Sequence, residues 1–368
     1  MAHSPVLRRK EFDRMKLKSK VSAVAGSLAV LALSISSPLA LAQAAAAQAP
    51  TPAAAPTAST ASAPTAQLAN LSPFPPPNPK LFTSDAVSVA TVNAFLTQLW
   101  GYDPARIWQV AAIQKTAAPG VTKIVVFVAQ KGVANKTSGT QFFVTPDGKH
   151  AIADAVIDFG ATPFAAARQT LEASADGAAR GAASKNLLLV EFSDLQCPHC
   201  KDAQPTMDKL AQDFPGARIV YQSFPLVDVH PSAFKAAAYG YCVEAKSNDA
   251  FFKYAQAVFD KQDALTTPET TDQTLGAAVT AAGLDPAQVA TCAATPETKA
   301  KVDASIKLAE ELNVNSTPTL FVNGRPLPMT SIPYETLKTI ISFQAVQDGV
   351  STGASNAPAT GATAPAAK

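Results

Sequence analysis

The sequence predicts an α/β protein with a helical segment inserted into its sheet domain and a smaller α+β unit before it. Three observations carry this prediction. A buried-strand pattern over 186–193 leads into the motif Cys-Pro-His-Cys at 197–200 and then into a helical pattern. A second apolar strand follows Pro318 and ends at Asn-Gly, residues 323–324, a turn signal. Between these strands, a segment at about 231–312 has the apolar periodicity of helices.

The N-terminus has the pattern of a secretory signal. A basic stretch precedes an apolar run over 21–36, and Ala-Leu-Ala at 40–42 supplies small residues for cleavage. The run is short for a membrane span, which needs about 20 residues. We therefore expect a cleaved signal peptide over 1–42, starting at Met1 or Met15, and a periplasmic or otherwise extracytoplasmic protein; an uncleaved membrane anchor is the alternative.

Two segments have a composition that does not support folding. Residues 43–80 and 347–368 consist largely of small residues and proline, with few charges. Such segments bury too little apolar surface to offset their chain entropy, so we expect a disordered linker and a disordered tail.

The smaller unit is expected over 81–168. A helix capped at Ser84-Asp85 precedes strand patterns at 122–129, 141–145 and 150–157. The unit has no chemical motif, and the Gly- and Ala-rich residues 169–185 are predicted to connect it to a domain over 186–346.

The motif at 197–200 has the setting of a redox pair. After a strand and before a helix, Cys197 would lie at a helix N-terminus, where free N–H groups and the helix dipole stabilise a thiolate. The thiolate is the attacking species in disulfide exchange, and Cys200 lies one turn along the helix, within reach of it. His199 adds a donor or a positive charge near the sulfur atom.

Other uses of this motif fit the sequence less well. A structural zinc site needs four ligands, and a second paired motif is missing. Haem attachment needs a histidine directly after Cys200, where Lys201 stands. The sequence therefore predicts a dithiol/disulfide couple without a cofactor or metal. A net charge of +2, without a dense basic stripe, predicts no nucleic-acid partner.

The segment from Val190 to Pro205 resembles the active-site segment of the thioredoxin superfamily, in particular its DsbA-like branch, which uses Cys-Pro-His-Cys. Glu191 matches the buried acidic residue of that branch, and Thr317-Pro318 matches the cis-proline that lies against the cysteines. The resemblance implies a catalytic set with Cys197 as the nucleophile and Cys200 as the resolving cysteine, together with Pro198, His199, Glu191, Thr317 and Pro318. The inserted helices at 231–312 are also typical of this branch.

The other two cysteines, Cys242 and Cys292, fall inside the insertion. Exported proteins seldom keep buried free thiols, so we expect a structural disulfide between them. Two free thiols and an electron-relay pair are the alternatives.

Together, the motif and the insertion imply a protein disulfide oxidoreductase that introduces disulfides into unfolded or partly folded exported proteins and is reoxidised by a membrane redox partner. Two features instead resemble the isomerase branch (DsbC-like and DsbG-like): Thr317 before the proline, and an α+β unit that dimerises in that branch. A homodimeric isomerase or reductase is thus the second hypothesis. A redox-inert binding module is the third, although both cysteines and Pro318 are present.

Overall fold

The computed structural model describes residues 72–133, 136–153 and 155–350. The predicted signal peptide, both candidate start residues, most of the linker over 43–80 and most of the tail over 347–368 lie outside these ranges. Within them, no helix combines the length and the apolar character that crossing a membrane requires.

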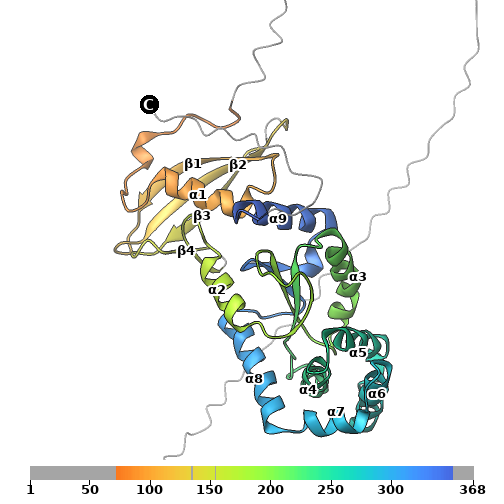
Figure 1. Cartoon of the computed structure of the whole chain (residues 1–368). Helices are drawn as coiled ribbons and strands as arrows, with labels where there is room; N and C mark the ends of the chain where they lie inside the picture. The colour runs from red at the N-terminus through yellow and green to blue at the C-terminus, as the bar shows by residue number, and fades with distance from the viewer. Residues whose placement is uncertain (1–71, 134–135, 154, 351–368) are drawn as a thin grey trace, which may run out of the picture. The chain divides into compact units, whose positions relative to one another are not determined.

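A five-stranded antiparallel sheet forms the smaller unit (Figure 1), with the strands in chain order. Its strands are β1 (Arg106–Lys115), β2 (Thr122–Gln130), β3 (Ser138–Val144), β4 (His150–Ile152) and β5 (Val156–Asp158). Helix α1 (Val89–Trp100) packs on this sheet through Val92, Phe95 and Leu96, which are buried with Ile124 and Val126 of β2.

The structure corrects two details of the smaller unit. Helix α1 begins at Val89 and not at Ser84, because the hydroxyl of Ser88 caps it by accepting the Thr91 N–H at 3.0 Å. Strand β1 was not predicted. Its register shifts between Val110 and Ala112, and such a bulge breaks the alternation by which a strand is recognised in a sequence.

The second sheet has the order β10-β9-β7-β8-β6, in which β7 and β8 are parallel and the other pairs are antiparallel. Its strands are β6 (Ala178–Gly181), β7 (Leu188–Ser193), β8 (Arg218–Ser223), β9 (Thr319–Val322) and β10 (Arg325–Pro328).

The expected connector over 169–185 is wrong in part, because it contains β6, an edge strand of this sheet. The glycines before and at the end of β6 allow its backbone to lie close to the backbone of the neighbouring segment. A Cβ on Gly177 would lie 2.0 Å from the carbonyl oxygen of Tyr221, and a Cβ on Gly181 would lie 2.2 Å from that of Ala217. The glycine content that suggested a loose segment reflects this close backbone approach.

Helices cover both faces of the second sheet (Figure 1). Helices α3 (Pro198–Asp213) and α9 (Tyr334–Gln347) pack on one face around Leu189 and Val322. On the other face, α2 (Ala165–Ser174) and α8 (Pro296–Glu311) pack around Val190 and Phe321. This is a thioredoxin-like α/β fold, and the predicted fold class is confirmed.

The insertion between β8 and β9 consists of five α-helices and a short 3-10 helix, with their own core (Figure 1). The α-helices are α4 (Ala233–Glu244), α5 (Asn248–Asp260), α6 (Pro268–Ala281), α7 (Pro286–Ala293) and α8. The helical segment expected at about 231–312 is confirmed. Cys242 on α4 and Cys292 on α7 form a disulfide, 50 residues apart in the chain.

Replacing Cys242 and Cys292 together with alanine is expected to lower the free energy of unfolding by about 4 kcal/mol, the loop-closure entropy of a loop of this length. Urea unfolding of the double variant and the wild type, monitored by circular dichroism, measures this difference. A loss below about 1 kcal/mol would contradict the expectation, because it would mean that the denatured chain gains little freedom.

Candidate active site

Cys197 is the N-cap residue of α3, and Pro198 occupies the first turn of that helix. The loop 194–197 connects the end of β7 to this helix, so the sheet fixes one side of the loop and the helix fixes the other. Both cysteines are free thiols, with 4% of Cys197 and 0% of Cys200 exposed, and both pack against the core of the helical insertion. Pro198 and His199 are exposed beside them.

The surroundings of Cys197 favour its thiolate. They lower its pKa from 9.0 to about 5, mainly through a hydrogen bond with the Cys200 thiol, which outweighs the opposing effect of burial. Hydrogen bonds from Thr317 and from the backbone at Cys200 and His199 contribute further. The backbone contribution comes from the first turn of α3, where N–H groups have no partner within the helix.

Cys200 has the opposite character. Its burial, and the negative charges that can form on Cys197 and Glu191, raise its pKa well above 9.0. The surroundings thus favour the thiolate form of Cys197 and the protonated form of Cys200.

Glu191 lies on β7 and is 2% exposed. Burial raises its pKa from 4.5 to about 7, although Ser193 and Gln204 offer hydrogen bonds that favour the ionised form. The Gln204 Nε2 lies 3.4 Å from Glu191 Oε1. A carboxyl group with this pKa, beside a buried thiol, can take up or release a proton near neutral pH.

The Glu191→Gln variant is expected to be more stable than the wild type at pH 8, by up to about 3 kcal/mol. Because the pKa of Glu191 is raised from 4.5 to about 7 on folding, the folded state retains its proton longer than the unfolded state. The wild type therefore loses stability as the pH rises through this window, whereas the variant does not.

Urea unfolding at pH 4 and pH 8 measures this effect, with both proteins in the Cys197–Cys200 disulfide form so that neither thiol titrates. Glu310→Gln, an exposed change of the same kind on α8, is the control. Equal pH dependence in wild type and Glu191→Gln would contradict the assigned pKa.

The peptide bond between Thr317 and Pro318 is cis, directly before β9. Strand β9 pairs with β7, and this pairing brings the loop before β9 to the loop that follows β7. The Cys197 Sγ lies 3.7 Å from the Thr317 carbonyl oxygen, across 120 residues of chain. The structure thus brings together Cys197, Cys200, Glu191 and Thr317-Pro318.

Sequence reasoning missed Asp194, the first residue of the active-site loop, which is 1% exposed. Its carboxylate accepts hydrogen bonds from the Gln196 N–H at 2.7 Å and the Leu226 N–H at 2.9 Å, and pairs with His230 Nδ1 at 2.7 Å. Its own N–H lies 3.3 Å from the Cys200 Sγ. The His230 side chain thus binds a residue 36 positions before it in the chain.

Sequence reasoning also missed two glutamines at the active-site loop, Gln196 and Gln262. Gln196 follows Asp194 in the loop, and Gln262 lies 65 residues after Cys197, in the insertion. Each side chain makes two hydrogen bonds to backbone atoms across the loop and the insertion. No local pattern marks either residue, since their roles depend on contacts between distant segments.

A hollow beside the motif is lined by His199, Asp202 and Thr206 of α3, and by Met329 and Thr330. It opens next to the exposed part of the motif. Among the described residues, no group of three or more His, Cys, Asp or Glu side chains is arranged to hold a metal ion.

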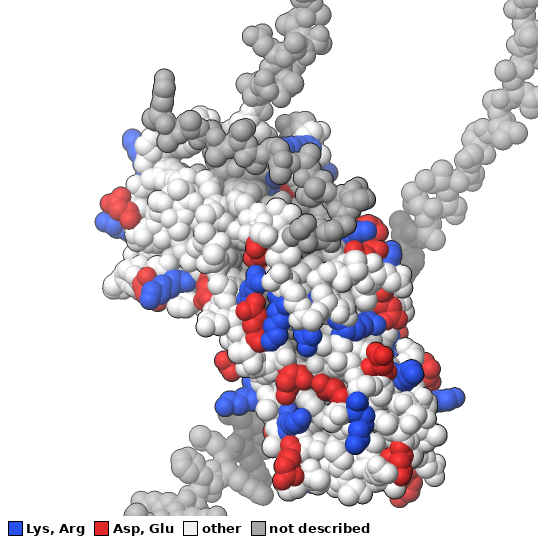
Figure 2. All heavy atoms as spheres, viewed as in Figure 1, with Lys and Arg blue, Asp and Glu red and all other residues white. Residues whose placement is uncertain are grey.

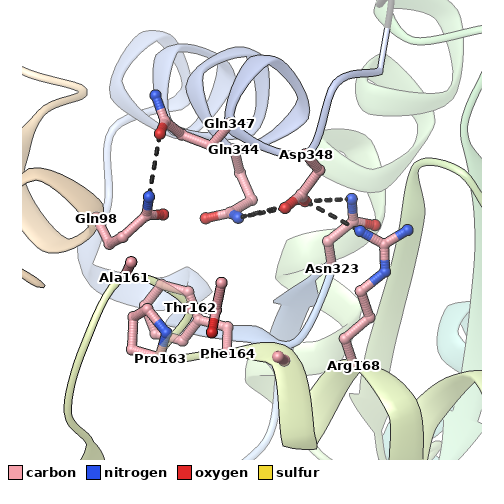
Figure 3. A pocket seen from close by; sticks show the side chains of 11 residues that line it. Gln98, Ala161, Thr162, Pro163, Phe164, Arg168, Asn323, Gln344, Gln347 and Asp348 are labelled. Atoms are coloured by element: carbon pink, nitrogen blue, oxygen red, sulfur yellow. Dashed lines mark hydrogen bonds and ion pairs between the residues drawn. The ribbon is translucent and has the colours of Figure 1, made fainter. Parts of the chain in front are cut away.

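A second hollow is lined by polar residues that bind one another (Figure 3). Asp348 accepts hydrogen bonds from Asn323 at 2.6 Å and Gln344 at 3.3 Å, and forms an ion pair with Arg168 at 3.3 Å. Neither cysteine of the motif lines it. We therefore interpret it as a structural polar cluster that joins the end of α9 to α2 and to the turn after β9.

The molecular face in Figure 2 carries charges of both signs, interspersed over the helices of the second domain. The part of this face over β1–β4 is largely uncharged, with charges at its margins. This face therefore offers no large field of one sign.

Comparison with known proteins matches the thioredoxin family model to residues 174–342. Among curated relatives, the chain is 34% identical over 148 residues to the Na(+)/H(+) antiporter NhaA 1 of Mycolicibacterium vanbaalenii, covering 39% of this chain and 23% of that protein. It is 30% identical over 147 residues to the Na(+)/H(+) antiporter NhaA 3 of Salinispora tropica, covering 40% of this chain and 21% of that protein. The chain spans less than a quarter of the length of these relatives.

Among solved structures, ScsC of Proteus mirabilis in a transitional conformation is similar at a TM-score of 0.40 and 22% identity, over 49% of this chain and 81% of that chain. Oxidised BdbD of Bacillus subtilis has a TM-score of 0.42 and 20% identity, over 46% and 93%. The thiol-disulfide exchange protein alpha-DsbA2 of Wolbachia pipientis has a TM-score of 0.41 and 17% identity, over 48% and 94%.

The family match covers the second sheet, helices α3 to α8 and both cysteines of the motif. Residues 174–342 are therefore a thioredoxin-like domain, and this domain carries the pair of free thiols at Cys197 and Cys200.

Proposed function

We propose that this protein is an extracytoplasmic dithiol oxidase that introduces disulfides into unfolded or partly folded exported proteins. The observation that carries the proposal is the contrast between the two thiols: the pKa of Cys197 is lowered to about 5 and that of Cys200 is raised. A stable Cys197 thiolate stabilises the reduced form, and this makes the disulfide form a stronger oxidant.

The reaction follows from this contrast. A client thiolate attacks Cys197 Sγ, the Cys197–Cys200 bond breaks, and Cys200 leaves and takes up a proton. A second client thiolate then attacks the client sulfur of the mixed disulfide, and Cys197 leaves as a thiolate. Two electrons pass from the client to the cysteine pair. In this proposal Glu191, whose charge acts on the Cys200 thiol, supplies the proton that Cys200 takes up.

The Thr317 carbonyl oxygen, 3.7 Å from Cys197 Sγ, supports a binding role for the loop before β9. An extended client segment can add its backbone beside this loop, in which Asn315 and Ser316 are exposed, as in other β-type peptide recognition. A membrane redox partner would then restore the disulfide by accepting the two electrons.

The test measures whether the protein transfers its disulfide to a client in a one-to-one ratio. The full chain in its disulfide form is mixed with a reduced, unfolded model protein, and free thiols are counted on both. The proposal expects one client disulfide for each Cys197–Cys200 pair reduced. It is wrong if the client keeps its thiols while the pair stays oxidised.

The second candidate is a dimeric isomerase or reductase. Thr317 before the cis-proline and the α+β unit formed by α1 and β1–β5 favour it. Light scattering on the full chain separates the two functions, because a monomer removes the dimer on which the isomerase hypothesis depends.

A further inference from the structure

The active-site loop and the helical insertion hold each other through two glutamine side chains. Gln262 begins the short helix η3 (Gln262–Ala264), between α5 and α6 of the insertion. Its Nε2 donates to the carbonyl oxygen of Leu195 at 3.0 Å and to that of Cys197 at 2.9 Å.

Gln196 makes the reciprocal contacts from the loop. Its Nε2 donates to the carbonyl oxygen of Leu265 at 2.9 Å, just after η3, and its Oε1 accepts the N–H of Ser232 at 2.7 Å, at the start of α4. Gln196 and Gln262 together form what we call the glutamine clasp.

We propose that Gln262 is a positioning residue for Cys197, through which the helical insertion sets the reactivity of the Cys197 sulfur. This inference deepens the proposed function and rests on it. The geometry behind it is the bond between the Gln262 amide and the carbonyl oxygen of the nucleophilic residue itself.

The Cys197 carbonyl has a special place in the helix. It accepts the N–H of Cys200 at 3.1 Å and that of Lys201 at 3.3 Å, so it closes the first turn of α3. Backbone groups of the same turn, at His199 and Cys200, contribute to the lowered pKa of Cys197. The Gln262 amide, by donating to this carbonyl, therefore fixes the orientation of the Cys197 peptide group. That orientation determines where the Cys197 sulfur lies relative to the N–H groups of the turn.

The burial of Gln262 agrees with a dedicated role. The residue is 8% exposed, and its amide donates to two carbonyl oxygens of one loop. A buried amide is costly unless it is hydrogen-bonded, and an apolar side chain of the same length would fill the space. Packing alone does not require an amide at this position.

The test compares the full-length Gln262→Met and Gln256→Met variants with the wild type. Methionine keeps the length of the side chain and adds no charge, so it removes the two donated bonds without a direct electrostatic effect on the thiolate. Gln256 lies exposed on α5 of the same insertion and bonds only to Asp260 among the described residues, so it is the matched control.

The readout is the pH titration of the Cys197 thiolate by its absorbance near 240 nm, with urea unfolding measured in parallel. Gln262→Met is expected to raise the Cys197 pKa by about one unit, the scale of one hydrogen bond to a charged group. Gln256→Met is expected to leave it unchanged. A purely structural role would lower stability and leave the thiolate titration in place, and that result overturns the inference.

If Gln262→Met does not fold, Gln262→Asn decides, because it keeps an amide but withdraws it by one methylene. An upward shift of the Cys197 pKa in that variant supports the inference, and an unshifted titration overturns it. Disulfide transfer by the wild type is measured separately. If the wild type does not transfer its disulfide, the oxidase function is refuted. The difference in Cys197 pKa between the variants and the wild type would still report the role of Gln262.

Discussion

The Cys197→Ala variant is expected to lose disulfide transfer completely, falling to the uncatalysed rate. Cys197 is the sulfur with the lowered pKa and the one that faces the Thr317 carbonyl oxygen, whereas Cys200 is 0% exposed. Without Cys197, no sulfur atom of the pair is both reactive and within reach of a client. The measurement counts disulfides formed in a reduced dithiol peptide.

Cys200→Ala is the matched variant, since it keeps the attacking sulfur and removes only the resolving one. With a client that carries a disulfide, this variant is expected to accumulate mixed disulfides. The Cys197 thiolate attacks the client disulfide and displaces one client thiolate, and no second thiol of the pair releases the bound client. Mass spectrometry of the trapped species would identify Cys197 as the linked residue. Transfer by Cys197→Ala at the wild-type rate, through Cys200, would contradict the assignment.

The reduction potential of the cysteine pair is expected to change its pH dependence near pH 5. Below this value, reduction takes up two protons with two electrons, so the potential falls by about 59 mV per pH unit. Above it, Cys197 stays a thiolate while Cys200, whose pKa is raised, takes up one proton. The slope then halves, to about 30 mV per pH unit.

The lowered pKa of Cys197 also determines how the stability of the reduced protein depends on pH. The folded reduced protein has a Cys197 pKa of about 5, lowered from 9.0. Its stability contribution is therefore complete above the unfolded value, decreases as the pH falls, and is lost below about 5. At pH 7 the Cys197 pKa lies two units below the pH. The reduction potential of the pair is therefore about 60 mV higher than that of a pair with an ordinary thiol.

Equilibration with glutathione buffers between pH 3.5 and 8 measures the slope, with the fraction reduced read by thiol labelling. Glu191→Gln should keep the break near pH 5, because Glu191 itself titrates at about 7. A constant slope of about 59 mV per unit up to pH 8 would show that the Cys197 thiol is not activated.

The sequence predicts those helices, strands and turns that are specified by residues close together in the chain. The strand before Cys197, the helix after it and the Asn-Gly turn at 323–324 are each specified by neighbouring residues, and they appear as β7, α3 and the β9–β10 turn. Strand β6 was missed because its glycines resemble those of a loop, although they permit close approach to β8.

The polar contacts around the thiols could not be predicted in the same way. Asp194 pairs with His230 across 36 residues, and Gln262 reaches Cys197 across 65. Neither pair has a periodicity or a spacing that distinguishes it from ordinary polar residues. Such contacts depend on how the insertion closes over the loop, which is a property of the folded chain.

The disulfide between α4 and α7 has a consequence for how the protein is made. Cys197 and Cys200 precede Cys242 and Cys292 in the chain, and four cysteines allow three pairings. Cys242 is 3% exposed, so its bond has to form before the surrounding helices close over it. A newly synthesised copy therefore needs an oxidant during maturation, and under the proposed function an older copy is a chemically suitable donor. The protein would then be among its own clients, and its accumulation would reinforce itself.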